Sequence, residues 1–183
     1  MSPTLHARLA FPADPRWSWQ VLPARGLGPI QAVGLAVDED GTLRQVRLNP
    51  AGRKAGDHGP GPRNPRQWAV HELGEYLAGR RRAFTLRWAL PDTLSPFRRA
   101  VLQVAAEIPF GATWTYGEVA ARAGSPGGAR AVGGAMGANP LPVVIPCHRV
   151  VAAGGRIGGF TGGVSLKRAL LRHEGVVRNP DDR

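Results

Sequence analysis

The stretch Val143-Val144-Ile145-Pro146-Cys147-His148-Arg149-Val150 holds the only cysteine of the chain, and the rest of the sequence is organised around it. Its apolar residues 143–145 predict a short buried strand, which ends at Pro146 because proline has no N–H to donate. The prediction places the Cys147 sulfur at the edge of a packed core, on extended backbone.

Cys147 has two possible roles. A lone cysteine is most often a small buried hydrophobic residue. Here His148 and Arg149 follow it directly, and cationic neighbours favour the thiolate and lower the pKa of a cysteine. A thiolate beside a possible base is what a nucleophile needs, so the context favours a reactive Cys147.

The composition limits the class of protein. The 183 residues, 43% of them hydrophobic, suffice for one large domain or two small ones. No apolar run approaches the length of a membrane span and no convincing signal peptide is present. The single cysteine fits a reducing cytoplasm, in which a reactive thiol survives, so we expect a cytoplasmic protein. A single cysteine excludes an intramolecular disulfide and a multi-cysteine zinc site, and we expect neither metal nor cofactor.

The net charge of +11 favours a polyanionic partner, most simply nucleic acid. Lysine occurs only at Lys54 and Lys167, so almost all the positive charge is arginine. A compositional bias typical of a GC-rich genome is the alternative explanation. It accounts for the choice of arginine better than for the excess of positive charge.

The first half of the chain predicts a small antiparallel sheet followed by a helix. Residues 17–22, 30–37 and 43–48 read as strands, and 49–64, with His58, as a surface loop. Asn64 and Pro65 open a helix that buries Val70, Leu73 and Leu77 and ends at Gly79. A short extended piece at 84–86 and a linker at 91–95 follow.

The second half predicts four helices. The first begins at Ser95-Pro96, and the second covers residues 116–123. Ser125 is expected to cap the third, over residues 127–138, and Ser165 the last, which ends at Gly175. The second and third form a helix-turn-helix pattern, although many such pairs are only packing units.

The third helix is unusually rich in glycine. Gly133, Gly134 and Gly137 lie within it, although an interior glycine costs about 1 kcal/mol of helix stability relative to alanine. A smooth face would let a nucleic-acid backbone or groove come close, or would pack against a neighbouring helix. In the last turn of the final helix, the carboxylate of Glu174 faces the negative end of the helix dipole, which predicts another partner for it.

Residues 108–175 resemble the catalytic domain of the O6-alkylguanine-DNA alkyltransferases, or methylated-DNA–protein-cysteine methyltransferases. The resemblance rests on several motifs in the family's order: Ile108-Pro109-Phe110-Gly111, Tyr116-Gly117-Glu118-Val119-Ala120, Ala129-Arg130-Ala131-Val132-Gly133-Gly134-Ala135-Met136, Asn139-Pro140, Pro146-Cys147-His148-Arg149-Val150 and His173-Glu174-Gly175. The helix after Pro65 resembles the end of the family's N-terminal domain, and residues 1–50 match only in general shape.

The resemblance implies an α+β fold. It would consist of an N-terminal domain at residues 1–91, with an RNase H-like antiparallel sheet plus helix. A mostly helical C-terminal domain at residues 92–183 would carry a winged-helix-like helix-turn-helix.

The resemblance also assigns the catalytic roles. Cys147 would accept the alkyl group, His148 would act as base through a water, and Glu174 would orient His148. Asn139 would tie the recognition helix to the active-site turn, and Tyr116 would donate its hydroxyl to the flipped guanine. Arg130 would fill the gap left in the base stack. The full set of residues expected to contact DNA or the base is Ser125, Ala129, Arg130, Gly133, Gly134, Met136, Val150, Phe160 and Thr161, with Ala135 beside them.

The implied activity is DNA repair by direct reversal of damage. The alkyl group of O6-alkylguanine, and also of O4-alkylthymine, would pass irreversibly to Cys147 in one turnover, after base flipping from the minor groove. The partner would be double-stranded DNA and the protein a monomer, with cooperative binding along DNA left open. Phe160 and Thr161 stand where many relatives have tyrosine and serine, and the cysteines that bind zinc in some relatives are absent.

Three other functions remain as alternatives. A non-catalytic protein that flags alkylated DNA would have its cysteine replaced, whereas Cys147 is intact. A cysteine hydrolase would need contact between Cys147 and His148, which adjacent residues on extended backbone do not readily make. A helix-turn-helix regulator would need more base-reading side chains than the glycine-rich helix carries.

Overall fold

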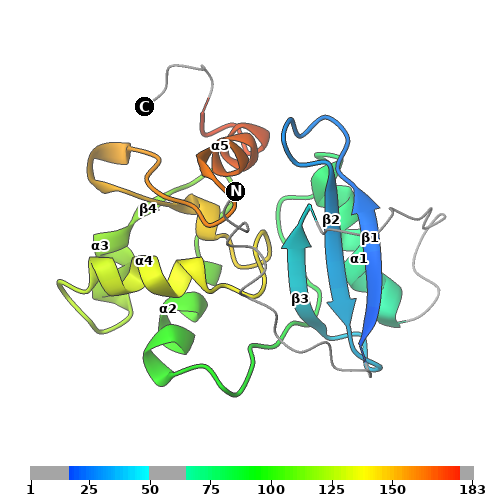
Figure 1. The fold of residues 1–183 in the computed structure, drawn as a ribbon, viewed down its shortest axis with the longest axis horizontal. Helices are drawn as coiled ribbons and strands as arrows, with labels where there is room; N and C mark the ends of the chain where they lie inside the picture. Colours follow the sequence, from blue (N-terminus) through cyan, green and yellow to red (C-terminus); the bar gives the residue numbers. More distant parts are fainter. Residues whose placement is uncertain (1–16, 50–64, 178–183) are drawn as a thin grey trace, which may run out of the picture.

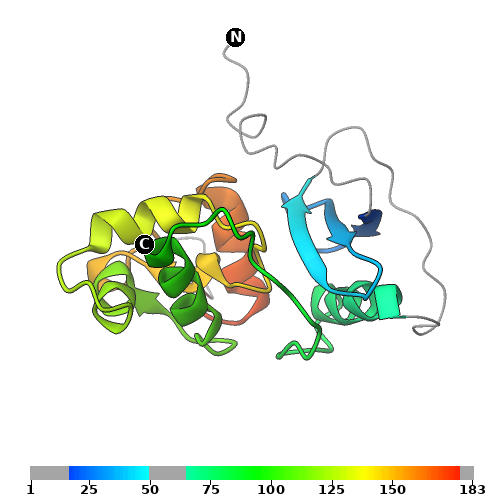
Figure 2. The same ribbon diagram turned by 90° about the horizontal axis from the view of Figure 1, so that it is seen from below.

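The computed structural model describes residues 17–49 and 65–177, and it has the expected α+β architecture. A three-stranded antiparallel sheet with one helix forms one side of the molecule, and the remaining helices form the other (Figures 1 and 2). Strand β3 lies at the sheet edge nearest the helical half (Figure 1). There the Val46 N–H donates to the Pro140 carbonyl at 2.9 Å, so the two halves are hydrogen-bonded to each other.

The sheet confirms the predicted strands to within two residues. It contains β1 (Ser18–Pro23), β2 (Ala32–Val37) and β3 (Leu43–Leu48), in that order. The turn between β2 and β3 is held by Asp38, whose Oδ1 accepts from the backbone N–H of Asp40 and of Thr42.

Helix α1 (Pro65–Leu77) packs against the sheet through the predicted buried residues Val70, Leu73 and Leu77. Gly79, at φ +74°, follows its end, in a conformation that glycine adopts without strain. The predicted loop at 50–64, with His58 and the proposed cap Asn64, lies outside the described residues.

Residues 84–86, predicted as a short extended piece, lie outside the sheet in a segment that is fastened to α1. The buried carboxylate of Glu72 accepts from the backbone N–H groups of Thr85 and Leu86 and from the Thr85 hydroxyl. Arg81 lies 3.4 Å from the same carboxylate. This arrangement places Phe84 against the ring of Tyr76 on α1.

The helical half contains α2 (Pro96–Ala106), α3 (Tyr116–Arg122), α4 (Ala129–Gly137) and α5 (Val164–His173). A two-residue strand, β4 (Trp114–Thr115), pairs in parallel with β5 (Val150–Val151). The predicted cap of α2 is confirmed, because the Ser95 hydroxyl accepts from the Arg98 N–H. Thr115 and Glu118 form a capping box at α3 that the sequence analysis missed. None of the helices within the described ranges is long and apolar enough to cross a membrane.

The predicted strand at 143–145 is wrong. Val143 and Val144 form a turn, with Val143 at φ +78°, and Cys147–Arg149 is a short 3-10 helix rather than extended backbone. The Ile145 N–H donates to the Leu141 carbonyl, and the Ile145 carbonyl accepts from the Asn139 side chain and from the Cys147 N–H. The groups that would pair with another strand are therefore used locally.

Two predicted helix caps are also wrong. Gly127, at φ +84°, cannot be helical, so α4 begins only after Gly128, and the Ser125 carbonyl accepts from the Gly128 N–H in a turn. At α5 the cap is Gly163 rather than Ser165, which falls inside the first turn. In both places a positive-φ glycine decides the boundary, and a serine nearby does not.

Candidate active site

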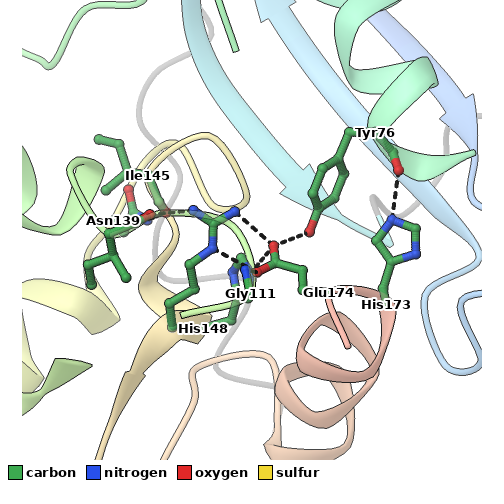
Figure 3. A network of polar contacts seen from close by, with 9 residues as sticks. Tyr76, Gly111, Asn139, Ile145, His148, His173 and Glu174 are labelled. Carbon is green, nitrogen blue, oxygen red and sulfur yellow. Dashed lines mark hydrogen bonds and ion pairs between the residues drawn. The ribbon is translucent and has the colours of Figure 1, made fainter. Parts of the chain in front are cut away.

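Cys147 opens the 3-10 turn that follows Pro146, and the residue is only 5% exposed. Asn139, just past the end of α4, fixes this turn: its Nδ2 donates to the Ile145 carbonyl at 2.8 Å, and its Oδ1 accepts from the Leu141 N–H at 3.0 Å (Figure 3). The position of the cysteine is therefore coupled to the end of the glycine-rich helix.

His148 is completely buried and binds Glu174 rather than the sulfur. Its Nε2 lies 2.9 Å from Glu174 Oε1 (Figure 3). Burial lowers the pKa of His148 from its usual 6.5, although the hydrogen bond to Glu174 opposes this. The imidazole is therefore neutral at pH 7, Nε2 donates to the carboxylate, and Nδ1 carries the free lone pair. Among the described residues, His148 Nδ1 has no hydrogen-bond partner.

Glu174 accepts hydrogen bonds from several side chains of the site. This confirms the prediction, made from the helix dipole, that its carboxylate has another partner. Burial alone would raise its pKa, but hydrogen bonds from His148 and Arg149 and their charges hold the pKa of Glu174 far below its usual 4.5. Arg149 binds it in a bidentate manner, with Nε 2.8 Å from Oε2 and Nη2 2.8 Å from Oε1. The carboxylate is therefore ionised throughout the physiological range.

The prediction that cationic neighbours activate the Cys147 thiol is wrong. Arg149 points to Glu174 and to the Ile108 carbonyl, and His148 is neutral. Burial raises the pKa of Cys147, and a hydrogen bond from Asn139 and the charge of Lys167 offset this only in part. The resting residue is a thiol, so its reaction needs a base.

Lys167 is a site residue that the sequence analysis missed. It lies on α5 with no exposed surface, and its Nζ donates to the Val150 carbonyl at 2.6 Å and to the Gly159 carbonyl at 3.3 Å. Burial lowers the pKa of Lys167 to about 8, against the opposing influence of Cys147. Its signal in the sequence was a lysine on the buried face of a helix, in a chain whose other cations are almost all arginine.

Tyr116 and the loop after β5 form one wall of the site. The Tyr116 hydroxyl donates to the Gly159 carbonyl at 3.3 Å, and its ring lies 5.6 Å from Lys167 Nζ. Burial raises the pKa of Tyr116, and so does the proximity of Cys147. Thr161 ties this loop to α4, since its hydroxyl donates to the Gly137 carbonyl at 3.1 Å, and Phe160 beside it is half-buried.

The residues expected to contact DNA differ in their exposure. Arg130 and Gly134 are exposed on α4, one turn apart on the same face, with Ala129 and Gly133 half-exposed beside them. The side chains of Ala135, Met136 and Val150 are buried, so they pack the core and do not reach the α4 surface. Ser125 lies half-buried in the turn before α4.

No group of three or more His, Cys, Asp or Glu side chains that could hold a metal ion occurs in residues 17–49 or 65–177. The polar side chains around Cys147 bind one another or the backbone instead, and only His148 Nδ1 among them is left without a partner within the described residues. The arrangement can deprotonate a thiol and donate hydrogen bonds to a bound group.

The family model described as "6-O-methylguanine DNA methyltransferase, DNA binding domain" matches residues 96–176. The methylated-DNA–protein-cysteine methyltransferase of Salmonella typhimurium is 49% identical over 107 residues, 58% of this chain and 61% of the relative. The chain therefore spans about three fifths of that relative's length. The methyltransferase of the same name from Methanothermobacter thermautotrophicus is 38% identical over 152 residues, 81% of this chain and 82% of the relative.

The fold is similar to that of a solved structure, the crystal structure of Mycobacterium tuberculosis OGT in complex with DNA. The TM-score is 0.69 at 34% sequence identity, and the match covers 85% of this chain and 91% of that one. The similarity therefore extends beyond the region around Cys147 to the sheet-containing half.

Proposed function

Because this chain belongs to the methylated-DNA–protein-cysteine methyltransferase family, we propose that it repairs DNA by moving the alkyl group of O6-alkylguanine onto Cys147. The observation that carries the proposal is a buried thiol in a turn whose next residue, His148, binds Glu174 through Nε2 and keeps Nδ1 free. O4-alkylthymine, whose alkyl group sits on an equivalent exocyclic oxygen, is proposed as a second substrate.

The chemistry is a displacement at the alkyl carbon. The Cys147 proton passes by way of a water to His148 Nδ1, the bond from Sγ to the carbon forms, and the bond from that carbon to O6 breaks. The proton then passes from His148 to the guanine leaving group, so the products are a neutral guanine and a thioether, and His148 is neutral again. Glu174 stabilises the imidazolium that forms in between. A thioether has no route back to the thiol here, so each chain acts once.

Tyr116 would act on the leaving group. Its hydroxyl now donates to the Gly159 carbonyl. A base flipped into the site would take over that donation, which stabilises negative charge developing on the guanine. Burial raises the pKa of Tyr116, so the hydroxyl keeps its proton at physiological pH.

The exposed face of α4 would contact the duplex. A Cβ at Gly134 would meet no atom within 4 Å, so this glycine leaves space for a DNA backbone or groove. Arg130 extends from the same face and would fill the gap left by the flipped nucleotide. We further propose that the protein works as a monomer in the cytoplasm, where its single thiol stays reduced.

Replacing the acceptor tests the proposal. Cys147→Ala should abolish alkyl transfer to the protein and leave the affinity for undamaged duplex DNA within about twofold, because the side chain is buried away from the α4 face. The measurements are transfer of a labelled methyl group and fluorescence anisotropy. Loss of DNA binding together with transfer, in a variant that is still folded, would count against the assignment of Cys147.

A further inference from the structure

Tyr76 connects the sheet-containing half to the site around Cys147. It lies in the last turn of α1 with no exposed surface, and its hydroxyl donates to Glu174 Oε1 at 2.7 Å, across 98 positions of sequence (Figure 3). The same oxygen accepts from His148 Nε2 at 2.9 Å. A phenol from one half and the imidazole beside the cysteine thus share one carboxylate oxygen.

The phenol is held rigidly from several sides. Its ring packs against Phe84, Phe110 and His173, with ring centroids 5.5, 6.3 and 5.0 Å away. The Tyr76 carbonyl accepts from His173 Nε2 at 2.7 Å, so backbone and side chain are both fixed (Figure 3). Glu72 fastens the segment that carries Phe84. The hydroxyl position is therefore set by α1 and its neighbours.

We propose that Tyr76 is a positioning residue for alkyl transfer, which acts by fixing the Glu174 carboxylate so that His148 Nε2 stays bound and Nδ1 stays free to accept a proton. This inference rests on the proposed function. By this role of Tyr76, the N-terminal half, residues 1–91 in the sequence-based division, helps His148 to accept the proton and does not only stabilise the fold.

The hydroxyl has a role that Arg149 does not duplicate. Arg149 contacts both carboxylate oxygens, and the Gly111 N–H lies 3.4 Å from Oε2, but Oε1 is restrained on the α1 side by Tyr76. Without the Tyr76 hydroxyl, Oε1 loses one hydrogen-bond donor, so its negative charge acts more strongly on His148 and raises the pKa of the imidazole. The other charged or titratable groups around the pair, Arg149, Lys167 and His173, stay in place, so the change at His148 is specific.

The test is Tyr76→Phe, which removes the hydroxyl and keeps the ring packing. Single-turnover transfer from duplex DNA containing O6-methylguanine should slow by roughly tenfold, as expected for one charge-assisted hydrogen bond. The acidic limb of its pH–rate profile should move to higher pH, because His148 becomes more basic. The affinity for undamaged duplex should not change. A wild-type rate and an unshifted limb would overturn the proposal.

Val70→Ala is the matched control, since Val70 is buried on α1 but its apolar side chain cannot hydrogen-bond to Glu174. It should lower the free energy of unfolding without moving the pH–rate profile. If Val70→Ala slows transfer and shifts the limb as Tyr76→Phe does, the effect is one of general stability and the positioning role is wrong.

A double-mutant cycle separates action through Glu174 from any other action of Tyr76. In a Glu174→Gln background, Tyr76→Phe should change the rate by less than about twofold, and an undiminished effect would overturn the proposal. The pH dependence of Cys147 carbamidomethylation by iodoacetamide can be measured without DNA. A limb that Tyr76→Phe shifts in this assay, in a protein that transfers no alkyl group, would mean that the proposed function failed and the positioning role did not.

Discussion

The reactivity of Cys147, the proposed acceptor, depends on its surroundings at the moment of reaction and not on a preformed thiolate. Burial raises its pKa, and the adjacent histidine and arginine, which in sequence look like activating cations, both turn to Glu174. A buried neutral thiol is protected from adventitious electrophiles, which suits the single reaction proposed for Cys147. His148, the proposed base, is part of the same turn.

Lys167 is the cation that acts on the thiol, and Lys167→Met should show it. Methionine fills a similar volume without the charge, so the pKa of Cys147 should rise further and carbamidomethylation by iodoacetamide at pH 7 should slow. The pH dependence of the iodoacetamide reaction is the measurement. Arg172→Met, which removes a charge from the exposed side of the same helix, is the control. An unchanged pH dependence in Lys167→Met would show that its charge does not reach the thiol.

The glycines of α4 lower the stability of the helix and leave its exposed face smooth. Gly134→Ala tests both effects separately, through stability and through DNA affinity. A Cβ at Gly134 meets no atom within 4 Å, so the variant should gain up to about 1 kcal/mol of stability in urea unfolding. The added methyl lies on the face of Arg130, so the affinity for duplex DNA should fall several-fold by fluorescence anisotropy.

Gly74→Ala provides the control, because Gly74 lies in α1, away from α4, and a Cβ there is equally free of neighbours. It should gain similar stability and bind DNA as the wild type does. If Gly134→Ala also binds DNA with wild-type affinity, the α4 face is not the contact surface.

Elements with regular periodicity and clear caps could be predicted from the sequence, and those decided by local hydrogen bonds could not. The strand at 43–48 and the helix that Ser95 caps were correct because alternation and capping act over a few neighbouring residues. The turn at 143–145 looked like a strand because Asn139, which satisfies its backbone, has no visible link to it in the sequence.

The candidate site shows the same division. A partner for Glu174 could be predicted from the helix dipole, because that argument uses only the position of a carboxylate in its own helix. The identity of Tyr76 as a partner could not, since the contact joins residues 98 positions apart. The burial of Lys167 and the direction in which Arg149 points likewise depend on packing between elements.

Across the whole molecule, the polar network around Glu174 makes stability depend on pH. The folded-state pKa of His148 lies below 6.5 and that of Glu174 far below 4.5, so the unfolded chain binds more protons in acid. The stability that these two groups contribute should be full above pH 6.5, should decline as pH falls below it through His148, and should decline more steeply below 4.5 through Glu174.

Urea unfolding between pH 8 and pH 3.5 measures this dependence, and Glu174→Gln should flatten the part below pH 4.5. The network joins both halves, since Tyr76 belongs to α1 and His148 to the turn of Cys147. One cooperative transition is therefore expected. Stability that is the same at pH 5 and pH 7.5 would contradict the buried, neutral state of His148.

The central claim is that Cys147 accepts one alkyl group from DNA, and intact-protein mass spectrometry after incubation with duplex DNA containing O6-methylguanine tests it most directly. The mass of one methylene should be gained, located on the peptide that carries Cys147 and saturating at one per chain. No gain of mass, with tight binding to the lesion, would contradict the account and indicate a protein that only marks alkylated DNA.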